Sequence, residues 1–180
     1  TNGAAPTREI GAEDDTQGAS LWGVCVDTQR MYVAGANSSR ITIYNSIPTD
    51  DTTYADLVLG QESLYTNIWR GPVPRSASDV LCVGHRLFVS QGYDRRILIY
   101  QDIPQTNCDA DNLLALSGFY SSHGAGSNQD PITEPGQVCS DGRRLFAADR
   151  DRGILIWNTL PTNDLVLPDR IISPDGVTEP

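Results

Sequence analysis

Short apolar runs recur along the chain, and the clearest of them alternate between the two faces of an extended strand. Residues 40–45 are Arg-Ile-Thr-Ile-Tyr-Asn, residues 96–101 are Arg-Ile-Leu-Ile-Tyr-Gln, and residues 153–158 are Gly-Ile-Leu-Ile-Trp-Asn. Gly, Asn, Asp and Pro separate the runs, and these residues favour the tight turns of antiparallel hairpins. The pattern therefore predicts many short strands and an all-β fold.

The strand pattern occurs three times. A first run holds a cysteine at position 25, 82 or 139, and the steps 82 − 25 and 139 − 82 are both 57. A polar turn, a second run, the alternating third run, a proline and a fourth run follow in each copy. Each copy is predicted to be a four-stranded antiparallel meander, with the three copies at residues 20–62, 77–118 and 134–175.

A lone sheet of this kind has two apolar faces to cover, and radial stacking of copies buries both of them. The repeats therefore predict blades of a β-propeller. Propellers typically have about four to eight blades, so we expect the chain to be part of a ring of about six, closed by a longer parent chain or by a second chain. Residues 1–15 resemble the stretch after each proline and are predicted to be the outer strand of a preceding or closing blade.

The repeat motifs resemble those of NHL-repeat propellers. Residues 23–27 (Gly-Val-Cys-Val-Asp), 30–34 (Arg-Met-Tyr-Val-Ala) and 37–44 match the first, second and third strands of that family. The long loops, with phrases such as Ile-Pro-Thr at residues 47–49, resemble its bacterial, surface or secreted branch. The resemblance implies the fold and a secreted, cell-surface or periplasmic location. It does not imply one function, because propellers include lyases, lactonases, lectin-like binders and adaptors.

Charge and hydropathy exclude several classes of partner. The chain has 13 Lys and Arg against 23 Asp and Glu, a net charge of −10, which repels a phosphate backbone. We therefore expect no nucleic-acid partner. No apolar stretch reaches the ~18 residues of a membrane span. The first residue is Thr1 rather than Met, which suggests that a signal peptide or further protein was removed upstream.

Cysteines are the most specific recurring feature. Cys25, Cys82 and Cys139 are expected at equivalent positions on the channel side of the first strands. They could form a ring open to a soft metal or to redox chemistry, or pack as small apolar residues between blades, which we favour. Neighbouring first strands are expected to lie beyond the ~7 Å Cα limit for a disulfide. Cys108 has no counterpart and is either a lone thiol or an intermolecular bridge.

No recurring catalytic set is found. The two histidines, His85 and His123, occupy unrelated positions, so they form neither an imidazole cluster for zinc nor a repeated pair with a carboxylate. Aspartates recur in the loops, where we expect solvated turn residues. The sequence thus predicts no catalytic residue, no metal ligand and no cofactor.

One inter-repeat loop is a candidate contact surface. It carries Tyr65, Trp69 and Arg70, residue types that are enriched at binding hot spots, although the aromatics could equally fold back onto their own blade. We predict a non-catalytic secreted or cell-surface scaffold that binds protein partners, including a copy of itself or the remainder of a longer propeller. The alternative is a metal-dependent six-bladed hydrolase or lyase with its site at the channel mouth, mostly outside this segment.

Overall fold

The computed structural model describes residues 21–35, 38–50, 53–63, 77–115, 131–173 and 176–178. Within these ranges the chain forms thirteen strands, and no helix is long and apolar enough to cross a membrane. The strands are β1 (Leu21–Val26), β2 (Met31–Gly35), β3 (Arg40–Tyr44), β4 (Leu57–Leu59), β5 (Ala77–Val83), β6 (Arg86–Gln91), β7 (Arg96–Tyr100), β8 (Asn112–Leu114), β9 (Pro135–Ser140), β10 (Leu145–Asp149), β11 (Gly153–Trp157), β12 (Arg170–Ser173) and β13 (Gly176–Thr178).

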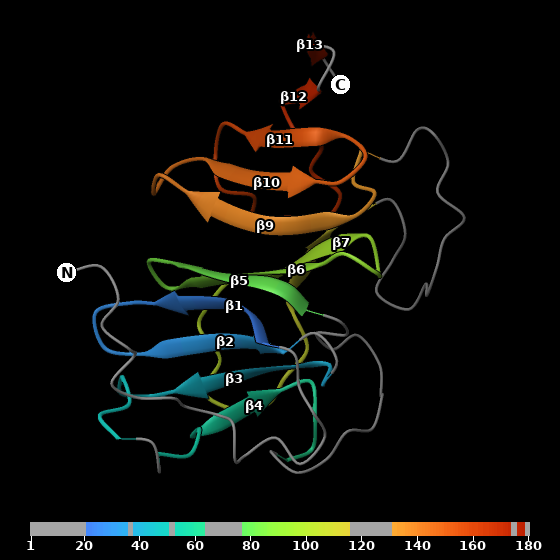
Figure 1. Cartoon of the computed structure of the whole chain (residues 1–180). Helices are drawn as coiled ribbons and strands as arrows, with labels where there is room; N and C mark the ends of the chain where they lie inside the picture. Colours follow the sequence, from blue (N-terminus) through green and yellow to red (C-terminus); the bar gives the residue numbers. More distant parts are fainter. Residues whose placement is uncertain are drawn as a thin grey trace, which may run out of the picture.

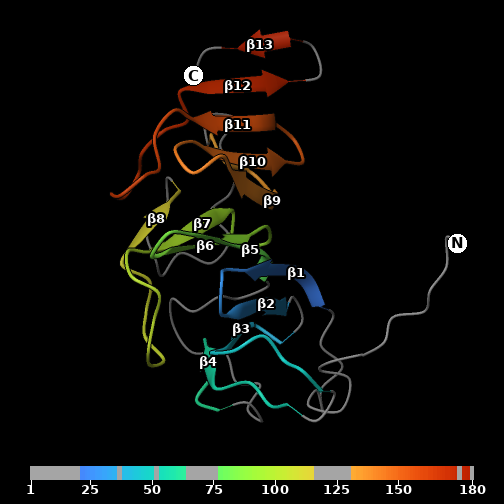
Figure 2. The same ribbon diagram turned by 90° about the vertical axis from the view of Figure 1, so that its left-hand side faces the viewer.

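The strands form three antiparallel sheets that stack face to face (Figures 1 and 2). Sheet 1 has the order β1-β2-β3-β4, sheet 2 the order β5-β6-β7-β8, and sheet 3 the order β9-β10-β11-β12-β13. The all-β fold with three four-stranded meanders is confirmed, and β13 is an addition that the repeat pattern did not predict. The first strands β1, β5 and β9 lie next to one another along one edge of the stack (Figure 1), which we call the inner edge.

Sheets 1 and 2 pack through alternate side chains of their facing surfaces. Tyr32, Ile41 and Leu59 of sheet 1 are fully buried, and Val80 and Val89 of sheet 2 lie in the same apolar cluster. Successive residues of a strand point to opposite faces, so the alternation seen in the sequence supplies one continuous apolar face. Burial of that face gives the main stabilisation of the interface.

Sheet 2 is covered on both faces. Its other side chains, including Phe88 and Ile97, pack against sheet 3 around Leu155 and Trp157. All five residues of β7 are consequently buried, which explains why this run is apolar at nearly every position although the strand is antiparallel.

The hairpins at the inner edge differ in length. Sheet 1 has a four-residue turn in which the Asp27 carboxylate accepts the backbone N–H groups of Gln29 (2.7 Å) and Arg30 (2.6 Å). Sheet 3 has the same turn, and hydrogen bonds from the backbone N–H groups of Arg144 and Arg143 lower the pKa of Asp141 to about 2. Sheet 2 has no aspartate at this point, and Val83 pairs directly with Arg86 across a two-residue turn at Gly84, which has a φ of 61°. Glycine suits this left-handed conformation.

The outer edges of sheets 1 and 2 are capped by the neighbouring sheet. Asn107, after sheet 2's third strand, receives the Gly60 N–H (3.1 Å) and donates to the Gln61 carbonyl (2.8 Å) beyond β4. Asp164 of sheet 3 accepts the Leu113 N–H of β8 at 2.8 Å. Exposed strand edges promote pairing with other chains, and these contacts hinder that pairing at the two outer edges. In sheet 3, β13 pairs with β12 and is itself the outermost strand.

Recurring aspartates also hold the fourth strands in place. The carboxylates of Asp56, Asp111 and Asp169 accept backbone N–H groups of the third-strand ends at 2.7 to 2.8 Å. Their own N–H groups donate back to the third strands. The expectation that such loop acids are merely solvated is therefore corrected for Asp111, because local side-chain to backbone hydrogen bonds give it a structural role.

Gly23 of β1 lies against Asp79 of β5 at the inner edge. A Cβ atom at Gly23 would lie 2.7 Å from the Asp79 Cα, which is closer than real Cβ contacts. Asp79 in turn accepts the Val138 N–H of β9 at 3.0 Å. The close approach of β1 to β5 therefore depends on a missing side chain at position 23.

Gly23→Ala should lower the free energy of unfolding by about 1–3 kcal/mol, because the added methyl group forces β1 and β5 apart. Urea unfolding measures this directly. Gly136→Ala is the matched control, since its Cβ would meet only the Ala148 carbonyl at 3.5 Å, and it should be neutral or slightly stabilising. Equal losses in the two variants would contradict the close approach.

Burial raises the pKa of Asp79 above its usual range. Because the folded-state pKa is raised, the folded protein holds this proton more tightly, and the stability gained at low pH is lost as pH rises through the folded pKa. Asp79→Asn keeps an oxygen acceptor for Val138 without the charge. It should be more stable than the unchanged protein at pH 7, and the difference in urea midpoint should shrink toward pH 4. A difference independent of pH would argue against a desolvated carboxylate.

Candidate functional site

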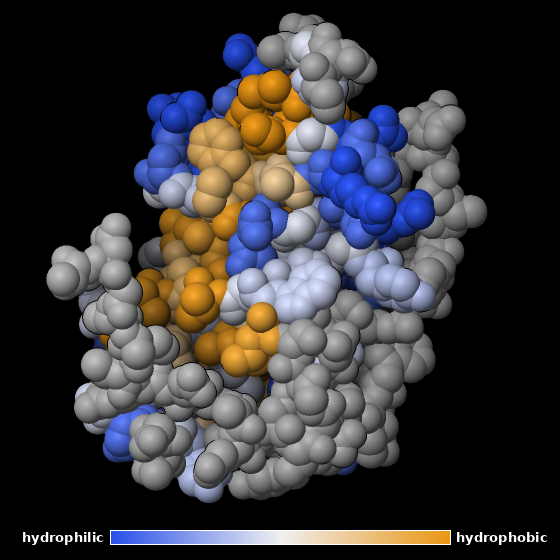
Figure 3. Space-filling model, viewed as in Figure 1, coloured by the Kyte–Doolittle hydropathy of each residue, from blue (hydrophilic) through white to orange (hydrophobic). Residues whose placement is uncertain are grey.

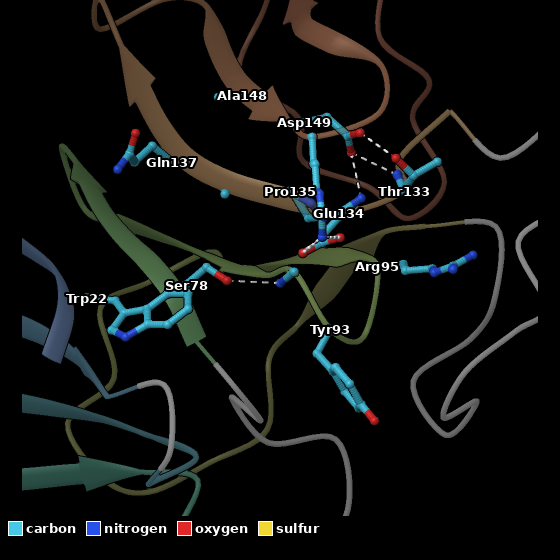
Figure 4. Close-up of a pocket in the computed structure, with 13 residues that line it drawn as sticks. Trp22, Ser78, Tyr93, Arg95, Thr133, Glu134, Pro135, Gln137, Ala148 and Asp149 are labelled. Carbon is cyan, nitrogen blue, oxygen red and sulfur yellow. Dashed lines mark hydrogen bonds and ion pairs between the residues drawn. The ribbon is translucent and has the colours of Figure 1, made fainter. Parts of the chain in front are cut away.

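An open pocket of about 920 Å³ lies at one end of the inner edge (Figure 4). All three sheets contribute to its lining: Trp22 from sheet 1, Ser78 and the β6–β7 turn from sheet 2, and residues 133–137 and 148–150 from sheet 3. A hollow that brings together three repeats is the usual place for a binding site in a repeat fold.

A bulge at the same place in each first strand shapes the pocket. The register with the second strand shifts between Leu21 and Gly23, between Ala77 and Asp79, and between Ala147 and Asp149 on the partner of β9. The extra residues at these bulges, Trp22, Ser78 and the Gly136–Gln137 pair, all line the pocket. A bulge leaves one residue unpaired and redirects its side chain, so three bulges turn side chains of the inner edge into the hollow.

The turn between β6 and β7 forms one wall. Its Gly92 N–H donates to the Ser78 hydroxyl at 3.1 Å, and the Arg95 N–H donates to the Gly92 carbonyl at 3.1 Å. The backbone of Arg95 has a φ of 55°, a left-handed conformation that tightens the turn. Tyr93 of this turn and Trp22 are 56% and 63% exposed. The pocket therefore offers two accessible aromatic rings.

Asp149 organises the opposite wall. It is 4% exposed and accepts hydrogen bonds from the Thr133 N–H (2.8 Å), the Glu134 N–H (3.0 Å) and the Thr133 hydroxyl (Figure 4). It also accepts the N–H groups of Asp151 and Arg152 at 3.2 and 3.1 Å. These bonds use the carboxylate for structure: they fix the segment before β9 and the β10–β11 turn against each other.

An ion pair lies on the rim. The Arg150 guanidinium is 3.0 Å from the Glu134 carboxylate, and the Arg150 N–H donates to the Glu134 carbonyl at 3.1 Å. Both side chains are largely exposed, so the pair contributes little to stability and its charges remain accessible to a ligand. With the aromatic rings and the Gln137 amide, the pocket can bind a polar partner that also has an apolar part.

The described residues form no metal site. In this part of the chain, no three His, Cys, Asp or Glu side chains are placed to hold a metal ion. His85 lies in the two-residue turn between β5 and β6, and the described lining of the pocket includes no histidine or cysteine.

The three recurring cysteines do not form a ring of equivalent positions. Cys25 pairs with Tyr32 and Cys139 with Phe146, but in sheet 2 Leu81 takes that place and Cys82 pairs with Leu87. The two-residue turn in sheet 2 shortens its hairpin, so the cysteine is shifted by one residue and points to the other face. Cys25 and Cys82 therefore meet between sheets 1 and 2, whereas Cys139 is exposed.

Other residues singled out from the sequence lie outside the described ranges: Tyr65, Trp69, Arg70 and His123, together with the strand expected within residues 1–15. The interaction loop stays a prediction. The sequence reasoning missed Trp22 and Tyr93. A signal for Trp22 was present, since a large aromatic residue stands directly before the first-strand motif, but bulges leave no clear mark in the sequence.

The sequence matches no family model and no curated protein. In structure, the chain is similar to a Bacteroides uniformis protein proposed to be a 6-phosphogluconolactonase, with a TM-score of 0.50 and 12% identity over 94% of this chain and 49% of that one. The sheets are β-propeller blades. At this identity the likeness shows the fold alone, and the chain spans about half the length of the propeller protein it matches.

Asp149→Ala should lower the free energy of unfolding by about 3 kcal/mol or more, because each buried donor left without its acceptor costs about 1–3 kcal/mol. Thermal or urea unfolding measures the loss. Asp151→Ala, which removes an exposed carboxylate from the same turn, should stay within about 0.5 kcal/mol of the unchanged protein. Similar effects of the two variants would show that Asp149 does not organise this wall.

Proposed function

We propose that this chain is a non-catalytic scaffold segment of an NHL-like β-propeller, which binds further blades through its two outward faces. The proposal includes a ring of about six blades and a secreted or cell-surface location, both of which rest on the resemblance of the repeat motifs. The observation that carries it is the contrast between equivalent side chains inside and at the ends of the stack.

The outward face of sheet 1 exposes apolar side chains whose equivalents in sheets 2 and 3 are buried. Val24 of β1 is 64% exposed, whereas Val80 and Val138, at the same register in sheets 2 and 3, are 2% and 6% exposed. Val26, also on this face of β1, is 53% exposed. Apolar side chains also gather on the visible surface along β1, β5 and β9 (Figure 3).

The outward face of sheet 3 shows the complementary contrast. Ile154 and Ile172 are 44% and 40% exposed, whereas Ile41 and Leu59 at the same positions of sheet 1 are fully buried against sheet 2. The two outward faces are thus the two halves of an interface that the stack makes twice internally. Contiguous apolar surface of this kind marks an interaction site.

A second copy of this chain fits these faces. The sheet 3 face of one copy presents the surface that packs on the sheet 1 face of the next copy. This head-to-tail contact gives a closed ring when a whole number of blades completes one full rotation. Two copies supply six blades, within the usual range for propellers. The remainder of a longer chain would use the same faces.

Light scattering on the eluting native protein should give twice 19.6 kDa, with a smaller species on dilution. Val24→Glu should raise the dissociation constant at least about a hundredfold, because an unpaired carboxylate would be buried at a cost of ~3 kcal/mol or more. Tyr54→Glu is the control: Tyr54 is 60% exposed in the connection before β4 and belongs to no strand of either face, and its replacement should leave the mass unchanged. A monomer at every concentration would overturn closure by a second copy.

The enzymatic alternative has less support. A six-bladed hydrolase or lyase would need a metal and convergent histidines or carboxylates at the channel mouth. The pocket at the inner edge has instead one carboxylate committed to structure, one paired with Arg150, and two aromatic rings. This composition favours recognition of a partner over catalysis.

A further inference from the structure

Two thiols from different sheets meet where β1 and β5 run side by side. The Cys82 N–H donates to the Cys25 Sγ at 3.0 Å, and the Cys25 Sγ lies 4.0 Å from the Cys82 carbonyl oxygen. Both cysteines are free and half-buried, and both border the apolar cluster between sheets 1 and 2. This juxtaposition of two oxidisable thiols has no role in the proposed scaffold function.

The separation suits a covalent bond. With Cys82 N at 3.0 Å and an N–Cα bond of about 1.46 Å, the Cys25 sulfur lies within about 4.5 Å of the Cys82 Cα. In a disulfide, the sulfur of one residue lies at about this distance from the partner's Cα, with Cα atoms about 4.4–6.8 Å apart. The expectation that neighbouring first strands lie too far apart for a bridge is wrong for β1 and β5 at Gly23, where an added Cβ atom would lie 2.7 Å from the Asp79 Cα.

We propose that Cys25 and Cys82 form a redox-active dithiol, which a disulfide-bearing oxidant converts into a covalent bond between the first and second blades. The site would take small disulfides as its substrates, and the product would fasten β1 to β5 at the inner edge. The proposal concerns contacts inside this chain and does not depend on how the outward faces are occupied.

The two thiols are not equally reactive. The hydrogen bond from the Cys82 thiol lowers the pKa of Cys25 to about 7, with further help from the Cys82 N–H, while burial and the nearby Asp79 carboxylate oppose it. The interaction with the Cys25 side chain raises the pKa of Cys82, and burial raises it further. The thiolate is the nucleophile in exchange reactions, so Cys25 attacks first.

The exchange takes two balanced steps. The Cys25 thiolate attacks one sulfur of the oxidant, which forms a mixed disulfide and releases one thiolate. Cys25 then carries no negative charge, so it no longer raises the pKa of the Cys82 thiol. Cys82 loses its proton to solvent and attacks the Cys25 sulfur, which expels the second thiolate of the oxidant. Two protein thiols are oxidised, and one small disulfide is reduced to two thiols.

The other cysteines lack such a partner in the described structure. Cys108 is exposed in the connection before β8, where burial and the neighbouring Asp111 and Asp109 carboxylates raise its pKa. Cys139 is exposed on the outward face of sheet 3. With small disulfides, these two should stop at mixed disulfides when the outward face of sheet 3 is uncovered, which gives an internal comparison within one sample.

The test equilibrates the full chain in buffers of graded reduced-to-oxidised glutathione ratio, blocks remaining thiols, and maps the peptides without reduction. We expect a peptide that joins Cys25 to Cys82, lighter by two hydrogen atoms than the two free thiols, while Cys108 and Cys139 carry glutathione. The urea midpoint of the oxidised protein should rise and return on reduction, because a bridge across 57 residues restricts the unfolded chain.

Cys82→Ser is the matched variant: Cys25 should then stop at the mixed disulfide with glutathione, and the midpoint should not rise on oxidation. Cys25→Ser should abolish the bridge as well, and Cys25→Ala serves if the serine variant is unstable. Glutathione on Cys25 in the unchanged protein, or a reduced Cys25–Cys82 pair when Cys108 and Cys139 are already modified, would overturn the proposal.

Discussion

A small antiparallel sheet with apolar side chains on both faces must be covered twice, and the rest of this structure depends on that requirement. Sheet 2 meets it, since β7 is buried along its whole length between sheets 1 and 3. Sheets 1 and 3 meet it on one face only, which leaves Val24 and Ile154 exposed where their equivalents are buried. The stack is therefore covered at its middle and apolar at its ends, and the same repeat causes both properties.

The inner edge is governed by a second requirement, that the backbone N–H groups of an edge strand find acceptors. Here the acceptors are side chains of the neighbouring first strand: the Cys25 sulfur for Cys82, and the Asp79 carboxylate for Val138. The Ser90 hydroxyl of β6 also donates to the Gly136 carbonyl of the first strand β9. These contacts tie the first strands together without ladder pairing. They also place a half-buried thiol and a desolvated carboxylate at the inner edge.

Most of the fold could be predicted from the sequence, because short apolar runs mark the strands of the three repeats and Asp, Gly or Pro marks the turns between them. The face of the sheet on which each side chain lies was harder to predict. A common step of 57 residues made three cysteines look equivalent, yet the turn at Gly84 is two residues long and those led by Asp27 and Asp141 are four. The spacing from cysteine to the arginine directly before the Met or Leu of the second run carries this difference: 86 − 82 is 4, whereas 30 − 25 and 144 − 139 are both 5.

The pocket could not be predicted in the same way, since it depends on bulges and on distances between repeats rather than on any one repeat. Ser78 and Trp22 line it because one extra residue in each first strand redirects a side chain. The sequence does show the residue type: Trp22 is an aromatic residue beside the first-strand motif, and its exposed ring does not contribute to the core.

The pocket and the uncovered face of sheet 1 share β1. Trp22 lines the pocket, while Val24, two residues further along the same strand, belongs to the uncovered face of sheet 1. Inside the stack, every covered face places another first strand, with its bulge, beside the previous one. A blade seated on the sheet 1 face would therefore add a further bulge next to Trp22, so the pocket would gain lining residues as the outward face became buried. A ligand that contacts both sides of Trp22 would then bind the assembled ring more tightly than the separate chain, and by linkage it would favour assembly.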